Sequence, residues 1–416
     1  MHVVLSIIFT IGLCALGHEA TLQMFPCRFG GMEVEVKLSP IPPEKLRGLP
    51  QKGEGDLWYG SITLGNGADT TITMAVWEGP EGPYVWLDGD NDEDLSDEGP
   101  GHWEWHKGWE RFLWRYRVNV EYRENGRDLH EPYLLRIMAR PNYDAENPPW
   151  YTYSICPGSH RRGVIDLDGK NVLIAIGEAD FDGVFTPEEL WVAVDTDNDG
   201  KISFYPYEIF RPGEPVHLDK TLYEVAFVSP SGSYIRLRPI GERPHPLPIL
   251  SVGRVFPDLE AKDISGKDFS LAELRGRIVA LFFVQESFLD LVCKGDGTKV
   301  CRNQWSHVCH RHRSIAEFFS DDPQVKVVVV LTDGEPPRLE KWRDPDLSWI
   351  VIWAPWALED YRVGTQAFVI DEAGVIRYRD ELTAHCFSCW ACPRYETSYA
   401  SPLDILWAIR RLKEAH

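Results

Sequence analysis

Cysteines are concentrated in the last third of this 416-residue chain, which contains nine of them. Cys293 and Cys301 bound a short loop that contains glycine, and Cys386, Cys389 and Cys392 form two overlapping C-x-x-C pairs. A thiolate is both a nucleophile and a metal ligand, and the C-x-x-C spacing is typical of redox motifs. These five cysteines are therefore the candidate catalytic residues for thiol–disulfide chemistry.

The same C-x-x-C segment admits a metal-binding interpretation. Three thiolates, from Cys386, Cys389 and Cys392, need one further ligand to complete a tetrahedral Zn²⁺ site, and His385 or Cys309 could supply it. The sequence alone leaves the redox and the zinc interpretations open.

Structural disulfides are the other alternative for the cysteines. A bridge between Cys293 and Cys301 could hold the loop between them without reacting. Cys27 and Cys156 stand alone in the first half, and in an oxidising compartment we expect them to form a structural bridge.

Three acidic segments repeat one pattern, in which side chains with hard oxygen atoms alternate with other residues around a turn. This spacing is typical of EF-hand loops, which wrap six to eight oxygen ligands around Ca²⁺. Residues 195–203 have Gly200 at the sixth position, residues 178–189 end on an acid at the twelfth, and residues 88–96 have Glu93 where glycine is expected. The candidate metal ligands are Asp195, Asp197, Asp199 and Ser203; Glu178, Asp180, Asp182 and Glu189; and Asp88, Asp90 and Asp92.

Asp, Asn and Gly also build solvated turns between strands without any metal, so a single loop would be ambiguous. The threefold repetition favours structural Ca²⁺ bracing the turns of an extracellular module. Repeated turns of this kind resemble the N-terminal modules that precede thioredoxin-like domains in some bacterial exported proteins.

The start of the chain predicts export. Residues 3–16 are apolar but too short to span a bilayer, and the small residues Ala15 and Gly17 are spaced like a cleavage site, so residues 1–17 read as a signal peptide. We expect a secreted, periplasmic or cell-envelope protein with no transmembrane segment. The net charge of −21 argues against nucleic-acid partners and anionic membrane surfaces.

The rest of the chain divides into a mainly-β domain, a connector and an α/β domain. Residues 18–237 contain short runs of β-branched and aromatic residues broken by Gly, Pro and Asn, typical of antiparallel sheets; the alternating aromatics of residues 102–106 suggest a strand with one buried face. Residues 238–249 are rich in proline and predict a stiff, extended linker. Residues 250–416 alternate strands and helices. We expect strands at 277–284, 325–331, 367–371 and 375–379, and helices at 306–319 and 403–412.

Two stretches of this last domain carry a family resemblance. Gly253 opens a G-x-x-x-P-D motif, residues 263–277 read D-I-S-G-K-D-F-S-L-A-E-L-R-G-R, and residues 368–377 read F-V-I-D-E-A-G-V-I-R. Together they resemble the redoxin (AhpC/TSA and thiol–disulfide reductase) superfamily. The resemblance implies a thioredoxin-like α/β fold behind a mainly-β domain.

The expected catalytic positions depart from the family pattern. The reductase C-x-x-C positions fall near Ser287 and Asp290, and the family's cis-proline position falls at Thr365. The peroxiredoxin Pro and Thr are absent and Cys293 falls one residue late, which argues against peroxidase activity. The resemblance implies a thiol–disulfide oxidoreductase acting on protein thiols and disulfides of the envelope or extracellular space. The alternative is a non-catalytic, calcium-stabilised binding or scaffold protein with a degenerate redoxin domain.

Overall fold

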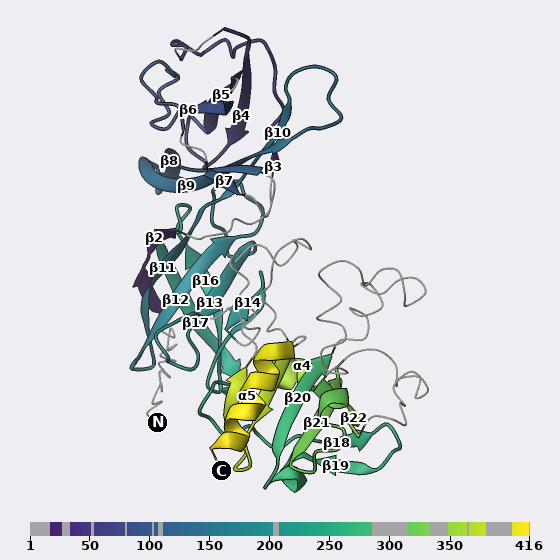
Figure 1. Ribbon diagram of the computed structural model, residues 1–416. Helices are drawn as coiled ribbons and strands as arrows, with labels where there is room; N and C mark the ends of the chain where they lie inside the picture. The colour runs from purple at the N-terminus through teal and green to yellow at the C-terminus, as the bar shows by residue number, and fades with distance from the viewer. Residues whose placement is uncertain are drawn as a thin grey trace, which may run out of the picture.

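The computed structural model arranges the chain as two β-sandwiches and one α/β domain, stacked end to end (Figure 1). The residues that it describes are 17–26, 34–50, 54–79, 81–101, 104–106, 111–202, 208–284, 315–332, 348–363, 366–379 and 402–415.

The first sandwich packs a three-stranded sheet against a five-stranded one. In β5, Ile72, Met74 and Val76 face the shared core. Ala75 faces outward and packs with Leu95 of the loop after β6, as the twofold repeat of a strand requires. The three-stranded sheet is β4 (Leu57–Thr63), β5 (Thr71–Gly79) and β6 (Gly82–Leu87). The five-stranded sheet runs β3 (Val34–Glu35), β10 (Tyr151–Pro157), β9 (Arg127–Pro141), β8 (Arg111–Glu124) and β7 (Glu104–His106).

The second sandwich has a core of its own, between a five-stranded and a four-stranded sheet. The five-stranded sheet runs β14 (Ile209–Phe210), β13 (Leu190–Val194), β12 (Lys170–Glu178), β11 (Ser159–Leu167) and β2 (Gln23–Pro26). The four-stranded sheet runs β1 (His18–Thr21), β17 (Tyr234–Glu242), β16 (Thr221–Val228) and β15 (Val216–Leu218).

The region expected to be one β-rich domain therefore contains two cores. The chain starts in the second sandwich with β1 and β2, builds the whole first sandwich, and returns at β11 to pair with β2. The first sandwich is thus an insertion within the second, which residue spacing alone could not reveal.

The expected linker is partly strand. β17 continues to Glu242, through the first residues of the proline-rich stretch. Pro239 has no N–H to donate. It is tolerated there because β1 pairs with β17 only as far as Leu237, so beyond that point β17 has no partner on that side among the described residues.

The α/β domain is built on a seven-stranded mixed sheet. β20, β21 and β22 are parallel, and β23 runs antiparallel to β20. The sheet order is β19 (Asp268–Ser270), β18 (Glu260–Asp263), β22 (Ile350–Trp353), β21 (Val325–Leu331), β20 (Ile278–Val284), β23 (Gln366–Ile370) and β24 (Ile376–Arg379). The described residues include the 3-10 helix η1 (Leu271–Leu274), the α-helices α4 (Ala357–Asp360) and α5 (Pro402–Glu414), and a helical segment at residues 315–318.

Both faces of this sheet are covered. α5 packs over β20, β23 and β24, while Phe256, Tyr361 and Val363 cover the opposite face. This explains the unbroken apolar sequence of β20 and β21. The four expected strands and the terminal helix are confirmed; of the expected helix at 306–319, residues 315–318 are helical and 306–314 lie outside the described residues.

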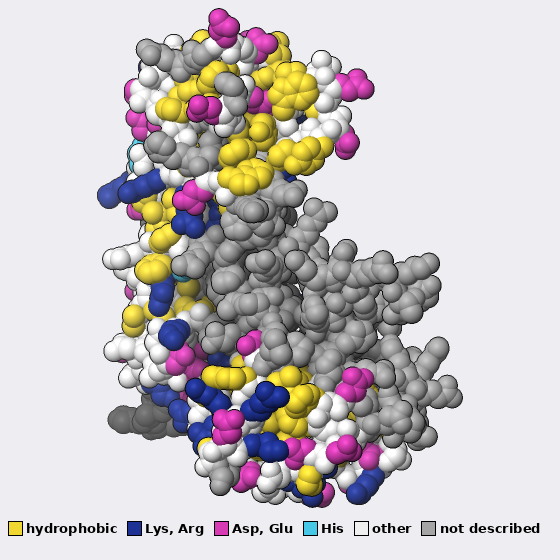
Figure 2. All heavy atoms as spheres, viewed as in Figure 1, with side chains coloured by type: hydrophobic (Ala, Val, Ile, Leu, Met, Phe, Trp, Pro, Cys, Tyr) yellow, Lys and Arg dark blue, Asp and Glu magenta, His cyan; other side chains and the backbone are white. Residues whose placement is uncertain are grey.

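The surface differs between the parts. Acidic side chains are spread over the first sandwich, whereas Lys and Arg gather where α5 lies, which carries Arg410, Arg411 and Lys413 (Figure 2). Trp105 in β7 is 48% exposed, so the expectation of a buried sheet-face residue is wrong for it; its ring packs edge-on against Phe112 at 4.8 Å. Among the described residues, no helix is long and apolar enough to cross a membrane.

Candidate metal centres and redox edge

The carboxyl ends of β20 and β21 are fastened together. The backbone N–H and the hydroxyl of Thr332 both donate to the carbonyl oxygen of Val284, at 3.0 and 3.3 Å, and Thr332 is buried. We call this side of the sheet, with the loop leading into β23, the redox edge, because the family resemblance expects its reactive thiols just beyond Val284. Parallel strands deliver the segments that follow them to this one edge.

The candidate thiols lie outside the described residues. This holds for Cys293, Cys301, Cys386, Cys389 and Cys392. It also holds for the substituted family positions Ser287, Asp290 and Thr365, and for the possible zinc ligands Cys309 and His385. Cys156 is buried in β10, and its expected partner Cys27 is again outside the described residues.

Arg362 joins the redox edge to the second sandwich. It lies shortly before β23, adopts a left-handed φ of 49°, and places its guanidinium 4.7 Å above the ring of Phe210. It donates to the carbonyl oxygen of Ile209 at 2.8 Å and to the carboxylate of Glu214. Burial alone would raise the pKa of Glu214, but the hydrogen bond from Arg362 holds that pKa below its ordinary value.

His217 completes this junction as a neutral base. Its Nδ1 lies 3.1 Å from Arg243 Nη1. Because a guanidinium can only donate, Nδ1 is the acceptor and the ring carries no charge. Burial, with the charges of Arg362 and Arg243, lowers the pKa of His217 to about 4, against the opposing pull of Glu214. Local sequence patterns could not indicate this junction, because its residues lie far apart along the chain.

The three acidic loops share one backbone conformation. In each, the first carboxylate accepts a hydrogen bond from the N–H of the sixth residue, and the fourth and sixth residues have positive φ. The bonded pairs are Asp88 and Glu93 at 3.0 Å, Asp195 and Gly200 at 2.9 Å, and Glu178 and Gly183 at 2.6 Å. Glu93 adopts a φ of 66° although it is not glycine, so the departure seen in the sequence does not alter the turn.

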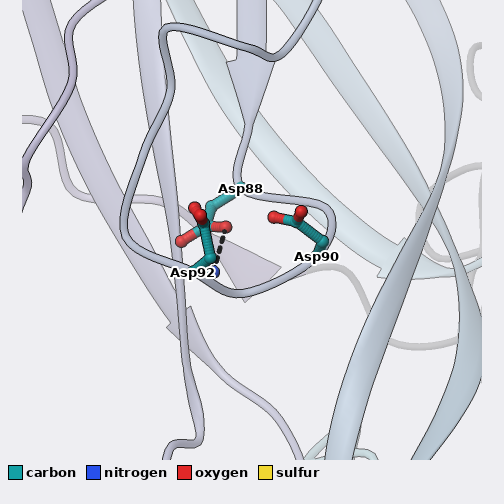
Figure 3. Close-up of side chains that lie close together, drawn as sticks. All are labelled: Asp88, Asp90 and Asp92. Atoms are coloured by element: carbon teal, nitrogen blue, oxygen red, sulfur yellow. Dashed lines mark hydrogen bonds between the residues drawn. The ribbon is translucent and has the colours of Figure 1, made fainter.

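Each loop brings its acids together. One carboxylate oxygen from each member lies within 4.8 Å of the others, and the groups are Asp88, Asp90 and Asp92; Glu178, Asp180 and Asp182; and Asp195, Asp197 and Asp199. Figure 3 shows the first group at the end of β6. Ser203 lies outside the described residues, and Glu189 is not in its group, its Oε2 instead accepting from Thr186 Oγ1 at 2.9 Å.

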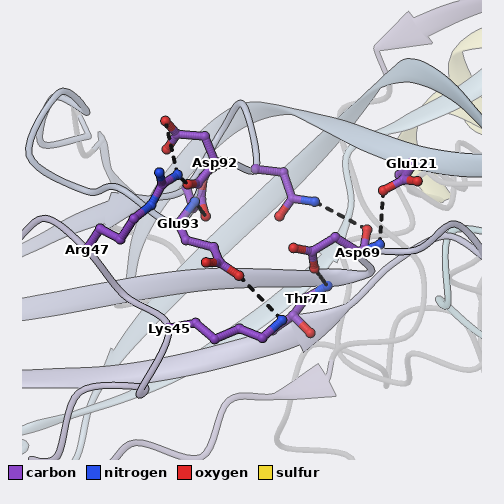
Figure 4. Close-up of polar contacts among 9 residues, drawn as sticks. Lys45, Arg47, Asp69, Thr71, Asp92, Glu93 and Glu121 are labelled. Carbon is purple, nitrogen blue, oxygen red and sulfur yellow. Dashed lines mark hydrogen bonds and ion pairs between the residues drawn. The ribbon is translucent and has the colours of Figure 1, made fainter.

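The surroundings of the three loops differ. Two basic side chains lie next to the first loop (Figure 4). Arg47 donates to the carbonyl oxygen of Asp92, and Lys45 Nζ lies 3.4 Å from Glu93 Oε1. They offset the negative charge of this loop. Burial raises the pKa of Asp88 to about 6.

The third loop lies close to the α/β domain. Burial raises the pKa of Asp197 and the charge of Asp199 adds to the effect, whereas Arg379, in β24, acts in the opposite direction. The positive charge of Arg379, a residue of the α/β domain, therefore acts on this group.

Comparisons with known proteins concern the α/β domain. The AhpC/TSA family profile matches residues 252–379. No curated protein matches the chain. Solved structures include the thioredoxin domain of a thiol–disulfide oxidoreductase from Bacteroides vulgatus (18% identity, TM-score 0.24, 32% of this chain and 89% of that one). Others are a thiol:disulfide interchange protein from Bacteroides sp. (19%, 0.26, 40% and 95%) and a thiol peroxidase from Chromobacterium violaceum (13%, 0.28, 41% and 94%).

Proposed function

Because residues 252–379 form an AhpC/TSA redoxin domain with a thioredoxin-like fold, we propose that this chain is an exported thiol–disulfide oxidoreductase acting on envelope or extracellular proteins. The observation that carries the proposal is the redox edge. There β20 ends at Val284, fastened to β21 through Thr332, and the next cysteines in the chain are Cys293 and Cys301.

The reaction needs two thiols. A thiolate attacks a disulfide of the partner protein, which forms a mixed disulfide and releases one partner thiol. The second cysteine then displaces the remaining partner sulfur. This chain ends with a Cys–Cys disulfide and the partner with two thiols, so two electrons pass to the partner.

Arg362 joins the second sandwich to the redox edge, where the proposed reaction would take place. The guanidinium of Arg362 holds Phe210 and Glu214 of that sandwich against the loop leading into β23. These contacts connect the redoxin domain to the second sandwich in addition to the connector. A partner protein approaching the redox edge would meet the second sandwich as well.

Paired cysteine variants test this function. If Cys293 and Cys301 react, the double variant Cys293→Ser/Cys301→Ser should abolish insulin reduction. The double variant Cys386→Ser/Cys389→Ser should then leave this activity intact. The reverse result would assign catalysis to the C-x-x-C segment. An active pair should have a reduction potential above roughly −250 mV. Loss of activity in neither variant, with all bridges below about −300 mV, would contradict the proposal.

The calcium-stabilised scaffold is the second candidate, and the shared conformation of the three acidic loops favours it. We propose that these loops bind Ca²⁺ structurally, and that Zn²⁺ at Cys386, Cys389 and Cys392 remains an alternative use of those thiols. Calcium binding is compatible with catalysis, so insulin reduction separates the two functions. Metal analysis of the purified chain, with and without a chelator, tests both ions.

A further inference from the structure

The loop between β12 and β13 belongs to both sandwiches. Phe181 is 6% exposed and packs in the core of the first sandwich, whereas Phe185, four residues later, is 5% exposed and packs in the core of the second. The carbonyl oxygen of Asp182 accepts a hydrogen bond from the backbone N–H of Gly65, in the first sandwich, at 2.8 Å. This loop therefore ties the inserted sandwich to its host.

Close packing fixes the loop at this point. A Cβ placed on Gly183 would stand 3.1 Å from the backbone nitrogen of Gly65 and 3.3 Å from the side chain of Leu64. Gly183 also has a φ of 78°, which favours glycine. The turn that gathers the acids is thus pressed directly against the first sandwich.

Glu178 brings an unsatisfied charge into this junction. Its side chain is buried, with the residue 5% exposed, and Oε2 accepts from the N–H of Gly183. Oε1 is buried and has no hydrogen-bond partner among the described residues, and the same is true of Asp180 Oδ1. A buried carboxylate oxygen without a partner is costly, and here two more carboxylates lie beside it.

Within this group, backbone N–H groups donate to Glu178 and to Asp182. Burial raises the pKa of Glu178 well above its ordinary value, and the charges of Asp182 and Asp180 add to the rise. Burial also raises the pKa values of Asp180 and Asp182, and the nearby charge of Glu189 adds to both. Glu178 is buried, Asp180 is half-buried and Asp182 is exposed, so the three carboxylates meet where the junction opens to solvent.

We propose that Glu178, Asp180 and Asp182 hold a Ca²⁺ ion that locks the two sandwiches together. The proposal rests on the calcium binding proposed above and gives this one loop a separate role. Hard carboxylate oxygens around a flexible turn suit Ca²⁺ better than a transition metal. The ion would satisfy the orphaned oxygens and so hold Phe181 and the carbonyl of Asp182 in the first sandwich.

The other two loops do not join the two sandwiches. Residues 88–95 cover the outer face of β4–β6 through Leu95, and residues 195–202 cover the outer face of β12–β14 through Ile202. Both oxygens of Asp88 and of Asp195 already accept backbone hydrogen bonds. Calcium at those loops would brace a turn but would not join two cores.

Hydrogen exchange of the full chain tests the lock, because the Gly65 amide is the donor across the junction. With Ca²⁺ in place of a chelator, we expect the peptide that contains Gly65 to exchange about tenfold more slowly. Glu178→Gln should lose one equivalent of bound Ca²⁺ in a calorimetric titration and lose this protection. Asp92→Asn, the matched control, should lose Ca²⁺ from its own loop and keep the protection.

The outcomes distinguish calcium binding itself from the proposed locking of the two sandwiches by the ion. If the unaltered chain binds no Ca²⁺ at millimolar concentration, calcium binding itself fails. If Ca²⁺ binds but the exchange of Gly65 does not respond to it, binding survives and the lock is wrong. This second comparison uses the unaltered chain, so it decides even if Glu178→Gln does not fold.

Discussion

Two junctions between domains contain acidic side chains, and they differ in whether a cationic side chain of the protein lies next to those acids. Between the second sandwich and the redoxin domain, the acid Glu214 is matched by Arg362, a cation that the chain itself supplies. Between the two sandwiches, the acids around Glu178 include buried oxygens with no partner among the described residues. The first junction thus contains its own cation, whereas for the second we propose that the cation comes from solution.

The largest effect should come from breaking the junction at Arg362. Arg362→Ala removes a largely buried guanidinium, 12% exposed, from Glu214, Ile209 and Phe210. Glu214, whose side chain is 30% exposed, would keep its hydrogen bond from the backbone N–H of Arg211. Losing the hydrogen bonds of the guanidinium and its contact with Phe210 should therefore cost about 3 kcal/mol. We expect calorimetry to show the redoxin domain unfolding separately from the second sandwich.

A control variant distinguishes the junction from a general loss of charge. Arg377 pairs with Asp371 inside the redoxin domain at 2.7 Å and is 49% exposed. Arg377→Ala should lower the free energy of unfolding by less than about 1 kcal/mol. It should not make the redoxin domain unfold separately from the second sandwich. Equal effects of the two variants would remove the special role of Arg362.

Glu178→Gln tests the junction between the two sandwiches, where we propose that Ca²⁺ binds. The change removes the buried charge but keeps the shape, so in chelator the variant should unfold at or above the temperature of the unaltered chain. In Ca²⁺ it should lack the stabilisation from this one site, leaving it about 1–3 kcal/mol less stable than the calcium-loaded chain. A variant that keeps the full calcium-dependent stabilisation would show that the ion does not bind there.

Acid should weaken the junction at Arg362 through His217. The folded-state pKa of about 4 lies below the ordinary value of 6.5, so the unfolded chain takes up the proton first. The stability that His217 contributes is therefore full above pH 6.5 and is lost as the pH falls towards 4. The ring is partly exposed, so the loss should be roughly 1–2 kcal/mol.

Denaturation at pH 7, 5.5 and 4.5 measures this effect. His217→Gln, which cannot take up the proton, should flatten the pH profile relative to the unaltered chain. Identical profiles for both proteins would exclude His217 as the source of the pH dependence.

The smallest effect should come from Lys45. It lies 3.4 Å from Glu93 beside the first acidic loop, and its side chain is 77% exposed. Lys45→Ala should change the free energy of unfolding by less than about 1 kcal/mol, because water screens exposed ion pairs. A larger loss in urea titrations would mean that this loop, too, depends on a neighbouring cation.

Local patterns in the sequence predicted much of this structure. The apolar run of β21 matches its observed bounds, since a strand buried on both faces needs no alternation. The spacing of Asp195, Asp197 and Asp199 predicted the acidic clusters, because a tight turn brings alternate side chains together.

Long-range pairings could not be predicted in this way. The pairing of β2 with β11, which makes the first sandwich an insertion, joins segments on either side of that whole sandwich. The contact of Arg362 with Glu214 and the placement of Phe181 in the neighbouring core depend equally on the assembled fold. The sequence placed Glu178 in a metal loop but could not show that one of its oxygens would be buried without a partner.

Scanning calorimetry of the full chain, with Ca²⁺ and with a chelator, tests most directly whether the two junctions differ in their need for a cation. At a calcium concentration of 100 times Kd, one site bound only by the folded protein adds about 2.7 kcal/mol. We predict that chelation lowers the melting temperature of the sandwiches and leaves that of the redoxin domain unchanged. Equal melting temperatures of the sandwiches in both solutions would contradict the account.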